Sequence, residues 1–325
     1  MNENTPISII IPTFNGAGRI GNCLKALERE TRGRNAEILV VDDGSRDNTA
    51  EVVQSFAGVR IFSQANAGPA SARNNGARQA KGEILLFTDD DCVPTEGWLN
   101  AMLAPFDDPQ VIGAKGTYRS AQPELAAKFV QIEYEDKYRI MAAQPSIDFI
   151  DTYSAAFRAA NFHEMGGYDT SFPVACAEDI ELSYLMSAKG WKMVFVPNAI
   201  VFHTHPNSFV NYFKKKYKFA FWRVLAVRKN PAKGVKDSHT PQLMKLQLLF
   251  LPALLAALAV DLFLHPALSL TALVVALFLF STLGFALRAA RSHLVLGILA
   301  PLLLAIRSGA QFLGVAMGMI FARAR

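Results

Sequence analysis

Three consecutive aspartates, Asp89, Asp90 and Asp91, follow the apolar run Ile84–Phe87 with one threonine between them. Neighbouring carboxylates repel each other and raise one another's pKa, so such a cluster is unfavourable unless water or a cation neutralises it. Mg²⁺ and Mn²⁺ take oxygen ligands and commonly bind one or two carboxylates together with phosphate oxygens. Side chains alternate along an extended chain, so Asp89 and Asp91 can share a face while Asp90 points elsewhere. The spacing therefore indicates either a solvated turn or a cation site in which Asp91 matters more than Asp90.

Two further polar clusters end apolar runs in the same part of the chain. Pro12, Thr13 and Asn15 close the run that begins at Ile7, and Asp42 and Asp43 close a second run. Helical patterns over residues 19–30 and 68–82 separate these runs, which predicts an α/β fold with a mostly parallel sheet. Ligands of such sheets collect at the carboxyl ends of the strands. We therefore expect all three clusters to converge on one binding site.

Two more candidate groups lie in residues 116–205, where the pattern mixes helices and strands. Glu178 and Asp179 begin a predicted helix, where the helix dipole favours negative charge. A carboxylate in that position could also serve as a general base. His203 and His205 alternate on a predicted strand, so only one of them can face a given side.

Several stretches, in this order and spacing, resemble the family 2 glycosyltransferases with a GT-A fold. They are ISIIIPTFN, EILVVDDGSRDNT, NAGPASARNNGARQAKGEILLFTDDDCVP, GGYDTSF and AEDIELSYLMSAKGW, and together they cover roughly residues 5–205. The resemblance implies a Rossmann-like catalytic domain that moves a sugar from a nucleotide-activated donor to an acceptor, with inversion at the anomeric carbon and with a divalent metal.

The resemblance implies site residues at the positions of this chain that match the family's motifs. Thr13 and Asp43 would lie against the base and ribose of the donor, with Asp42 supporting that turn. The nucleotide-sugar site that the resemblance implies comprises Pro12, Thr13, Asn15, Asp42, Asp43, Arg73, Asp89 and Asp90.

The resemblance also implies the metal and catalytic residues. Asp91 would bind Mg²⁺ or Mn²⁺, with Asp89 at the other end of the DxD pattern and His203 or His205 near the metal. Asp179 would be the catalytic base and Glu178 its partner. Nothing in this chemistry requires a nucleophilic cysteine, so Cys92 is interpreted as a packing residue.

The composition of the chain changes abruptly near residue 246. From there to the C-terminus it contains no Lys or Glu and a single acidic residue, Asp261. Segments 246–264 and 268–287 are each near the roughly 20 residues needed to span a bilayer. A third apolar segment, 294–322, contains Pro301 and Arg307, and it could be a span, a re-entrant element or an interfacial helix.

The segment before these spans is rich in lysine and arginine. Residues 206–230 alternate aromatic with basic side chains, which suits a helix on a membrane surface, although an ordinary surface helix is the alternative. Because basic residues prefer the cytoplasmic side, they place the N-terminal domain in the cytoplasm and favour two spans. We therefore predict a catalytic domain (1–205), an interfacial linker (206–245) and a multi-pass region (246–325) in the cytoplasmic, or inner, membrane.

The functional expectation combines the motifs with the apolar tail. We expect an inverting, metal-dependent glycosyltransferase that uses a nucleotide sugar, most commonly UDP-linked in this family, with GDP and dTDP as alternatives. The acceptor would be lipid-linked, in cell-envelope glycan or glycolipid synthesis. The net charge of +5, without a nucleic-acid-binding motif, gives no indication of a nucleic-acid partner. A processive polysaccharide synthase, or a non-catalytic membrane subunit of a glycan assembly complex, remains the alternative.

Overall fold

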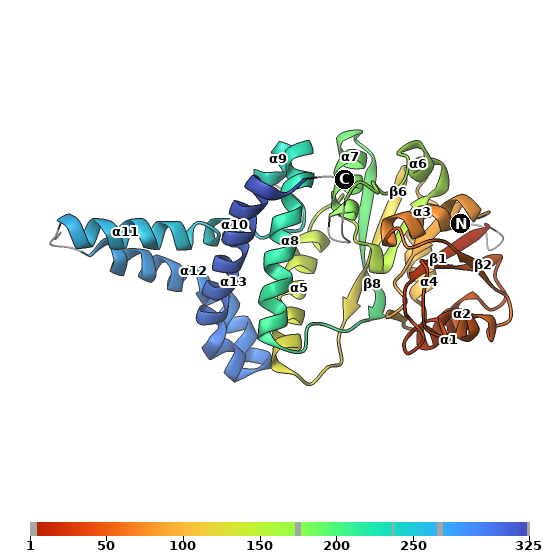
Figure 1. Cartoon of the computed structure of the whole chain (residues 1–325), viewed down its shortest axis with the longest axis horizontal. Helices are drawn as coiled ribbons and strands as arrows, with labels where there is room; N and C mark the ends of the chain where they lie inside the picture. The colour runs from red at the N-terminus through yellow and green to blue at the C-terminus, as the bar shows by residue number, and fades with distance from the viewer. Residues whose placement is uncertain (1–4, 173–176, 236, 265–268, 324–325) are drawn as a thin grey trace.

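The computed structural model describes residues 5–172, 177–235, 237–264 and 269–323. A sheet covered by helices lies at one end of the molecule, a layer of long helices stands beside it, and a helical hairpin projects from the other end (Figure 1). Residues 265–268, which include the start of the predicted span 268–287, lie outside the described residues.

The sheet has the order β3-β2-β1-β4-β7-β6-β8-β5. Strands β1 to β4 run parallel to one another, and β6 runs parallel to β8. Strand β7 is antiparallel to β4 and β6, and β5 is antiparallel to β8. The α/β class and the mostly parallel sheet are thus confirmed. The strands are β1 (Ile7–Thr13), β2 (Ala36–Asp42), β3 (Val59–Ser63), β4 (Ile84–Phe87), β5 (Val93–Pro94), β6 (Val111–Arg119), β7 (Ala155–Arg158) and β8 (Lys192–Phe202).

Helices cover both faces of this sheet, which explains why its central strands are continuously apolar. Successive residues of β1 enter opposite cores: Ile9 and Ile11 pack on one face and Ile10 on the other. The first face carries α1 (Ile20–Thr31), α2 (Thr49–Gln54), α4 (Trp98–Leu103) and the 3₁₀ turns Ala104–Asp107 and Thr152–Ser154. The second carries α3 (Pro69–Gln79), α6 (Ala159–Glu164), α7 (Glu178–Ala188) and part of α5 (Leu125–Ala142).

The predicted convergence of strand ends is present in the register. Thr13 at the end of β1 pairs with Asp42 at the end of β2, and β4 runs parallel on the other side of β1. The three polar clusters therefore leave the sheet at the same edge.

The third apolar segment forms one continuous helix, α13 (Leu294–Phe321), which packs along α8 (Phe209–Lys229). Two glycines permit the close approach: a Cβ on Gly314 would lie 2.5 Å from the carbonyl oxygen of Tyr217, and one on Gly318 would lie 2.4 Å from that of Phe221. Arg228 of α8 donates to the carbonyl oxygen of Ala322 at 3.0 Å. This contact lies at the C-terminal end of α13, where the helix dipole also favours a positive charge. The short helices α9 (Pro231–Val235) and α10 (Gln242–Gln247) follow α8.

Arg307 in the middle of α13 is buried against the sheet domain. It donates to Glu133 of α5 at 2.8 Å and to Gln247 of α10 at 2.6 Å, and Lys216 of α8 also pairs with Glu133 at 2.9 Å. Burial opposes the charge of Glu133, but Lys216 and Arg307 together hold its pKa down at about 2. The charge that makes this segment ambiguous in the sequence therefore joins α13 to α5.

Replacing Arg307 with leucine is expected to destabilise the fold by about 3–5 kcal/mol, because it leaves Glu133 buried with only Lys216 as a partner. The measurement is the denaturation midpoint of the detergent-solubilised protein. Arg291→Leu is the matched control, because Arg291 is exposed near the end of α12. Equal midpoints for the two variants would contradict the structural role of Arg307.

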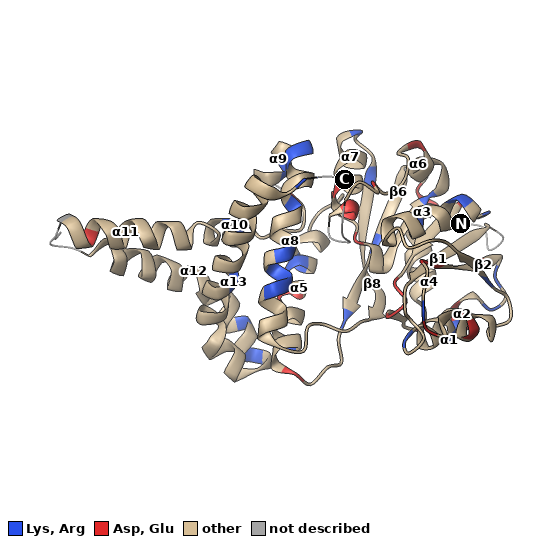
Figure 2. Ribbon diagram, viewed as in Figure 1, with Lys and Arg blue, Asp and Glu red and all other residues tan. Residues whose placement is uncertain are grey.

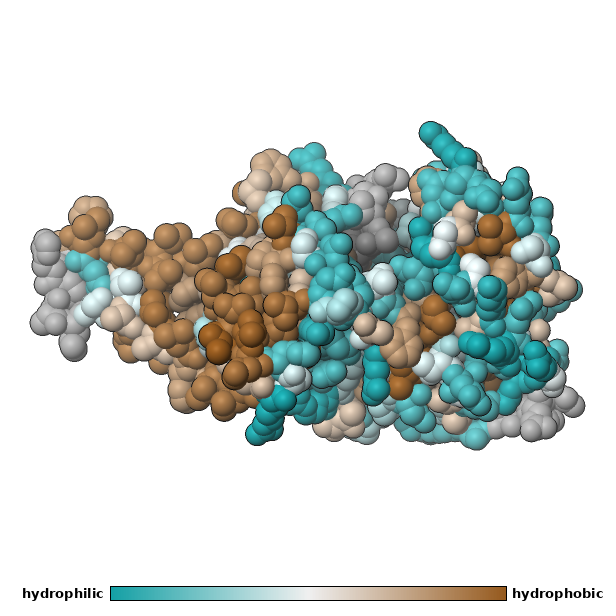
Figure 3. Space-filling view, turned by 90° about the horizontal axis from the view of Figure 1, so that it is seen from below, coloured by the Kyte–Doolittle hydropathy of each residue, from teal (hydrophilic) through white to brown (hydrophobic). Residues whose placement is uncertain are grey.

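The projecting hairpin consists of α11 (Phe250–Leu264) and α12 (Leu270–Ser292). By length and composition, α12 and α13 could cross a membrane, whereas the apolar helix at 250–263 is shorter. Figure 2 shows almost no charged residues along the hairpin, and Figure 3 shows its surface as largely hydrophobic. Its acidic residue, Asp261, accepts hydrogen bonds from the hydroxyl of Ser269 at 2.7 Å and from the backbone N–H groups of Leu270 and Thr271 at 2.9 Å. Asp261 thus satisfies donors at the start of α12.

Candidate active site

A cavity of about 770 Å³ lies between the sheet domain and the layer of long helices. The sheet domain contributes Arg73, Asp89, Asp179 and His203 to its lining, among others. Helices α8, α10 and α13 contribute a second wall that mixes basic and apolar side chains. The cavity therefore joins the predicted site residues to the apolar C-terminal region.

Arg73 of α3 connects two motifs that are far apart in the sequence. It is buried, and it donates to Asp89 at 2.6 Å and to Glu178 at 3.4 Å. Burial disfavours the guanidinium charge, but Asp89 and Glu178 hold the pKa of Arg73 above its ordinary value. The aspartate triplet and the Glu178–Asp179 pair consequently form one site.

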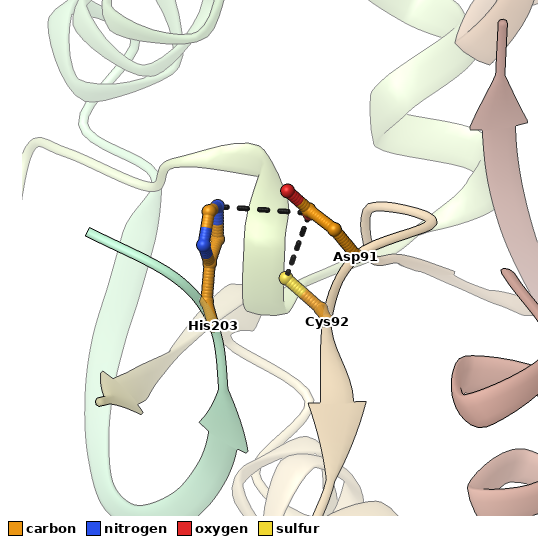
Figure 4. Close-up of side chains that lie close together, drawn as sticks. All are labelled: Asp91, Cys92 and His203. Carbon is orange, nitrogen blue, oxygen red and sulfur yellow. Dashed lines mark hydrogen bonds and ion pairs between the residues drawn. The ribbon is translucent and has the colours of Figure 1, made fainter. Parts of the chain in front are cut away.

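Asp91, Cys92 and His203 lie close together (Figure 4). His203 Nε2 is 3.6 Å from a carboxylate oxygen of Asp91, and burial raises the pKa of Asp91 above its ordinary value. Burial also raises the pKa of the Cys92 thiol well above its ordinary value, so the thiol stays neutral. One carboxylate and one imidazole fit Mn²⁺ better than Mg²⁺, which strongly prefers an all-oxygen shell.

His205, which we predicted as an alternative metal ligand, lies outside this group. Its Nδ1 is 2.9 Å from the hydroxyl of Tyr118 and its Nε2 is 3.0 Å from Oε1 of Gln131. Because both ring nitrogens already have partners, the structure does not support His205 as a ligand. Asp89 is likewise absent from the Asp91 group, and its carboxylate faces Arg73 instead.

Asp90 has a structural environment that differs from its neighbours. It is buried, accepts a hydrogen bond from the hydroxyl of Thr13 at 2.6 Å, and pairs with the guanidinium of Arg19 at 2.7 Å and 3.0 Å. A Cβ on Gly16 would lie 2.5 Å from the Asp90 carboxylate, which explains the glycine in this turn. Asp90 and Thr13 therefore hold the end of β1 against the end of β4, and neither is free to bind a nucleotide with these atoms.

The predicted residues at the end of β2 organise their own loops. Asp43 accepts from the backbone N–H groups of Ala67 at 2.9 Å and Gly68 at 2.8 Å, and Asp42 accepts from that of Ser45 at 2.9 Å. Asn15, with a φ of 49°, accepts from the backbone N–H of Arg46 through its side-chain oxygen at 2.8 Å. Pro12 is buried within β1. Asp42, Asp43 and Asn15 therefore stabilise the loops at the carboxyl ends of the strands through hydrogen bonds to backbone N–H groups.

Asp179 lies at the beginning of α7 and lines the cavity. Burial, followed by the nearby charges of Glu178 and Asp151, raises the pKa of Asp179 to about 8. A carboxylate with this pKa can accept a proton near neutral pH. The geometry thus places a potential base in the same cavity as His203 of the Asp91 group.

Several cavity residues were not predicted from the sequence. Lys115 of β6 is buried, pairs with Asp151 and donates to the hydroxyl of Tyr153 at 2.7 Å. A lysine inside an otherwise apolar strand was an available signal for it. Lys137 of α5 and Lys215 of α8 also line the cavity, and nothing in their surface-like sequence context marks them.

Comparisons with known proteins identify the family and the fold that this chain resembles. Residues 8–166 match the family model described as glycosyl transferase family 2. Validoxylamine A glucosyltransferase of Streptomyces hygroscopicus subsp. jinggangensis is 30% identical over 221 residues, which cover 58% of this chain and 52% of the relative. The O-antigen chain rhamnosyltransferase RfbN of Salmonella typhimurium is 25% identical over 213 residues, covering 61% of this chain and 66% of the relative. The chain thus spans about half the length of the first of these relatives.

A solved structure resembles almost the whole chain. The mannosyltransferase PcManGT of Pyrobaculum calidifontis, in complex with GDP-Man and Mn²⁺, covers 98% of this chain and 88% of its own, with a TM-score of 0.63 and 19% identity. At this identity the likeness concerns the fold, and it extends through the C-terminal helices.

Proposed function

We propose that this protein transfers a sugar from a nucleotide-sugar donor to a lipid-linked acceptor held at a membrane, because residues 8–166 match the family model described as glycosyl transferase family 2. The observation that carries the proposal is a cavity whose lining includes His203 of the Asp91 group and Asp179 together with residues of the helices α8 and α13. A water-soluble donor can approach from the strand ends, and an acceptor with an apolar part can approach from the helical wall.

The proposed donor site lies at the converging strand ends. Asp91 and His203 would hold Mn²⁺, which would stabilise the negative charge that develops on the departing nucleotide diphosphate. The loops fixed by Asp42, Asp43 and Asn15 would receive the nucleotide. UDP-sugars are the first donors to test and GDP-sugars the second, since PcManGT was solved with GDP-Man and Mn²⁺.

Asp179 is the proposed base for a hydroxyl acceptor. It would take the proton as the acceptor oxygen attacks the anomeric carbon opposite the leaving nucleotide, which inverts that centre. Arg73 donates to both Asp89 and Glu178, so it would hold the aspartate triplet of the proposed donor site and the Glu178–Asp179 pair at a fixed separation. An acceptor that is already an anionic phosphate would need positioning rather than deprotonation.

The hairpin α11–α12 is the proposed membrane anchor, with the sheet domain on the cytoplasmic side. Its exposed side chains are large and apolar, among them Leu262, Phe263, Leu277 and Phe280. Helix α13 is joined along its length to the basic helix α8, which is too polar to enter the hydrocarbon, so we place α13 beside α8 at the membrane surface. α11 covers only about 22 Å at about 1.5 Å per residue, so the apolar residues before it must contribute to any full crossing.

The proposed function is tested with the purified protein in neutral detergent. UDP- and GDP-sugars are screened with Mn²⁺ by thermal shift, and nucleotide release is then measured with and without extracted membrane lipids. We expect one donor to raise the melting temperature and lipid to stimulate its turnover. Donor binding without turnover on any lipid would favour the non-catalytic subunit, and long products in mass spectrometry would favour the processive synthase.

The raised pKa of Asp179 predicts that the rate for a hydroxyl acceptor falls on the acidic side of the pH profile. The base must be ionised, and its pKa of about 8 means that the ionised fraction increases as the pH rises through that value. We therefore expect kcat/KM, measured with both substrates below saturation, to increase from pH 6 to about pH 8.5 and then level off. A flat profile over this range would argue against Asp179 as the base.

A further inference from the structure

The cavity contains more positive charge than its carboxylates neutralise. Most of its basic residues have acidic partners: Lys115 pairs with Asp151, Lys216 with Glu133 at 2.9 Å, and Arg223 and Lys245 with Asp237 at 2.9 Å and 3.1 Å. Arg73 pairs with Asp89 and Glu178. These pairs occupy the acidic side chains around the cavity, apart from the proposed base and the proposed metal ligand.

Three basic residues of the lining, Lys137, Lys215 and Arg228, have no carboxylate partner among the described residues. Arg228 donates to the carbonyl oxygens of Ala322 and Met319, which leaves the two lysines. Each instead lies over an aromatic ring of its own helix, Lys137 over Tyr134 at 5.2 Å and Lys215 over Phe219 at 5.4 Å. Burial and the nearby charge of Lys216 lower the pKa of Lys137 to about 7 and also lower that of Lys215. Two half-buried ammonium groups beside a third cation are an unfavourable arrangement that an anion would relieve.

The two lysines line the same cavity as Asp179 and His203, Lys137 from α5 and Lys215 from the α8 part of the helical wall. Lys215 is within electrostatic reach of Asp91 and Asp89, and Lys137 is within reach of Asp151 and Arg223. Figure 2 shows that the basic residues of α8 form a cluster beside α5. An anion held by both lysines would therefore be adjacent to the proposed site of sugar transfer.

The helical wall of the cavity also presents apolar side chains. Val224 and Val227 of α8, Met244 of α10, and Val315 and Met319 of α13 line the same cavity. An occupant that satisfies both regions must have an anionic group next to an apolar body. A free anion would use the lysines but leave the apolar wall without a partner.

We propose that Lys137 and Lys215 form the binding site for the phosphate or diphosphate group of a lipid acceptor, whose apolar chain lies against α8 and α13. This assignment rests on the proposed function and specifies the acceptor class for the same cavity. The basic residues of α8 then differ in role: Lys215 lines the cavity and would bind the acceptor, whereas Lys214 and Lys218 are exposed.

The test measures binding of farnesyl phosphate, farnesol and inorganic pyrophosphate to the full-length protein in neutral detergent. We expect farnesyl phosphate to bind about tenfold or more tightly than farnesol and than pyrophosphate. Lys137→Met and Lys215→Met should each lower the affinity for farnesyl phosphate about tenfold, the loss typical of one hydrogen bond to a charged group. The affinity for farnesol should not change in either variant. Lys218→Met, an exposed lysine of the same helix, should change neither affinity.

The remaining outcomes overturn the proposal in distinct ways. Equal affinities for farnesyl phosphate and farnesol would exclude an anion site. If pyrophosphate binds as tightly as farnesyl phosphate and its binding depends on the lysines, a role of the lipid chain in binding is excluded. Loss of nucleotide and Mn²⁺ binding in Lys215→Met, with farnesyl phosphate unaffected, would assign that lysine to the donor. Melting temperatures without ligand establish that each variant is folded. If farnesyl phosphate binds as expected but no donor is turned over, the anion site stands and the proposed function fails.

Discussion

Asp91→Asn is expected to reduce sugar transfer by a hundredfold to a thousandfold while leaving the fold intact. Asp91 is partly exposed, it lies beside His203, and it is the carboxylate of the described group that could hold a metal. Losing a group that stabilises charge in the transition state has costs of this size. The measurement is turnover at saturating donor, combined with Mn²⁺ titration, which should show a higher metal requirement in the variant.

Asp90→Asn is the matched control, and its effect should appear in stability rather than chemistry. Asp90 is buried between Thr13 and Arg19, so weakening those contacts should cost about 1–3 kcal/mol of folding stability. We expect a lower denaturation midpoint with the Mn²⁺ requirement unchanged. Equal losses of activity and equal Mn²⁺ requirements in the two variants would mean that the triplet acts as a diffuse acidic patch.

Asp179→Asn is expected to reduce transfer to a hydroxyl acceptor by a hundredfold to ten-thousandfold, the range for removal of a general base. Donor binding, measured by thermal shift with Mn²⁺, should be unaffected because Asp179 lies on the acceptor side of Arg73. Asp169→Asn is the control, since Asp169 precedes the same helix but pairs with Lys229 at 2.6 Å.

The same variant distinguishes the two acceptor chemistries. If the acceptor is an anionic phosphate, Asp179→Asn should retain much of its activity, because no proton has to be removed. Full activity with hydroxyl and phosphate acceptors alike would contradict any direct role for Asp179.

The sheet was predictable because its signal is local. The central strands are apolar on both faces, so runs such as Ile7–Thr13 and Ile84–Phe87 can be recognised as strands from the sequence alone. Parallel strands end at the same edge of the sheet, which predicts where their polar residues meet. The alternation of His203 and His205 also predicted that only one would face the site. Which of the two it is depends on Tyr118 and Gln131, which lie far away in the sequence.

The helical wall of the cavity was not predictable in this way. Lys137, Lys215 and Arg307 have ordinary surface or interfacial patterns in the sequence, and their roles arise only when α5, α8 and α13 pack together. The sequence of α13 left three interpretations open because Arg307 has no local partner. Its partners, Glu133 and Gln247, are supplied by α5 and α10.

The ion pair between Arg307 and Glu133 has a practical consequence for producing the protein. A common way to obtain a soluble glycosyltransferase is to end the chain before its hydrophobic tail, here near residue 245. That truncation would remove the partner of a buried carboxylate and the part of the cavity wall that α13 contributes, so the shortened chain should be unstable and poor at holding an acceptor. Expression of the full length, in detergent or lipid nanodiscs, is therefore the suitable route for assaying this protein.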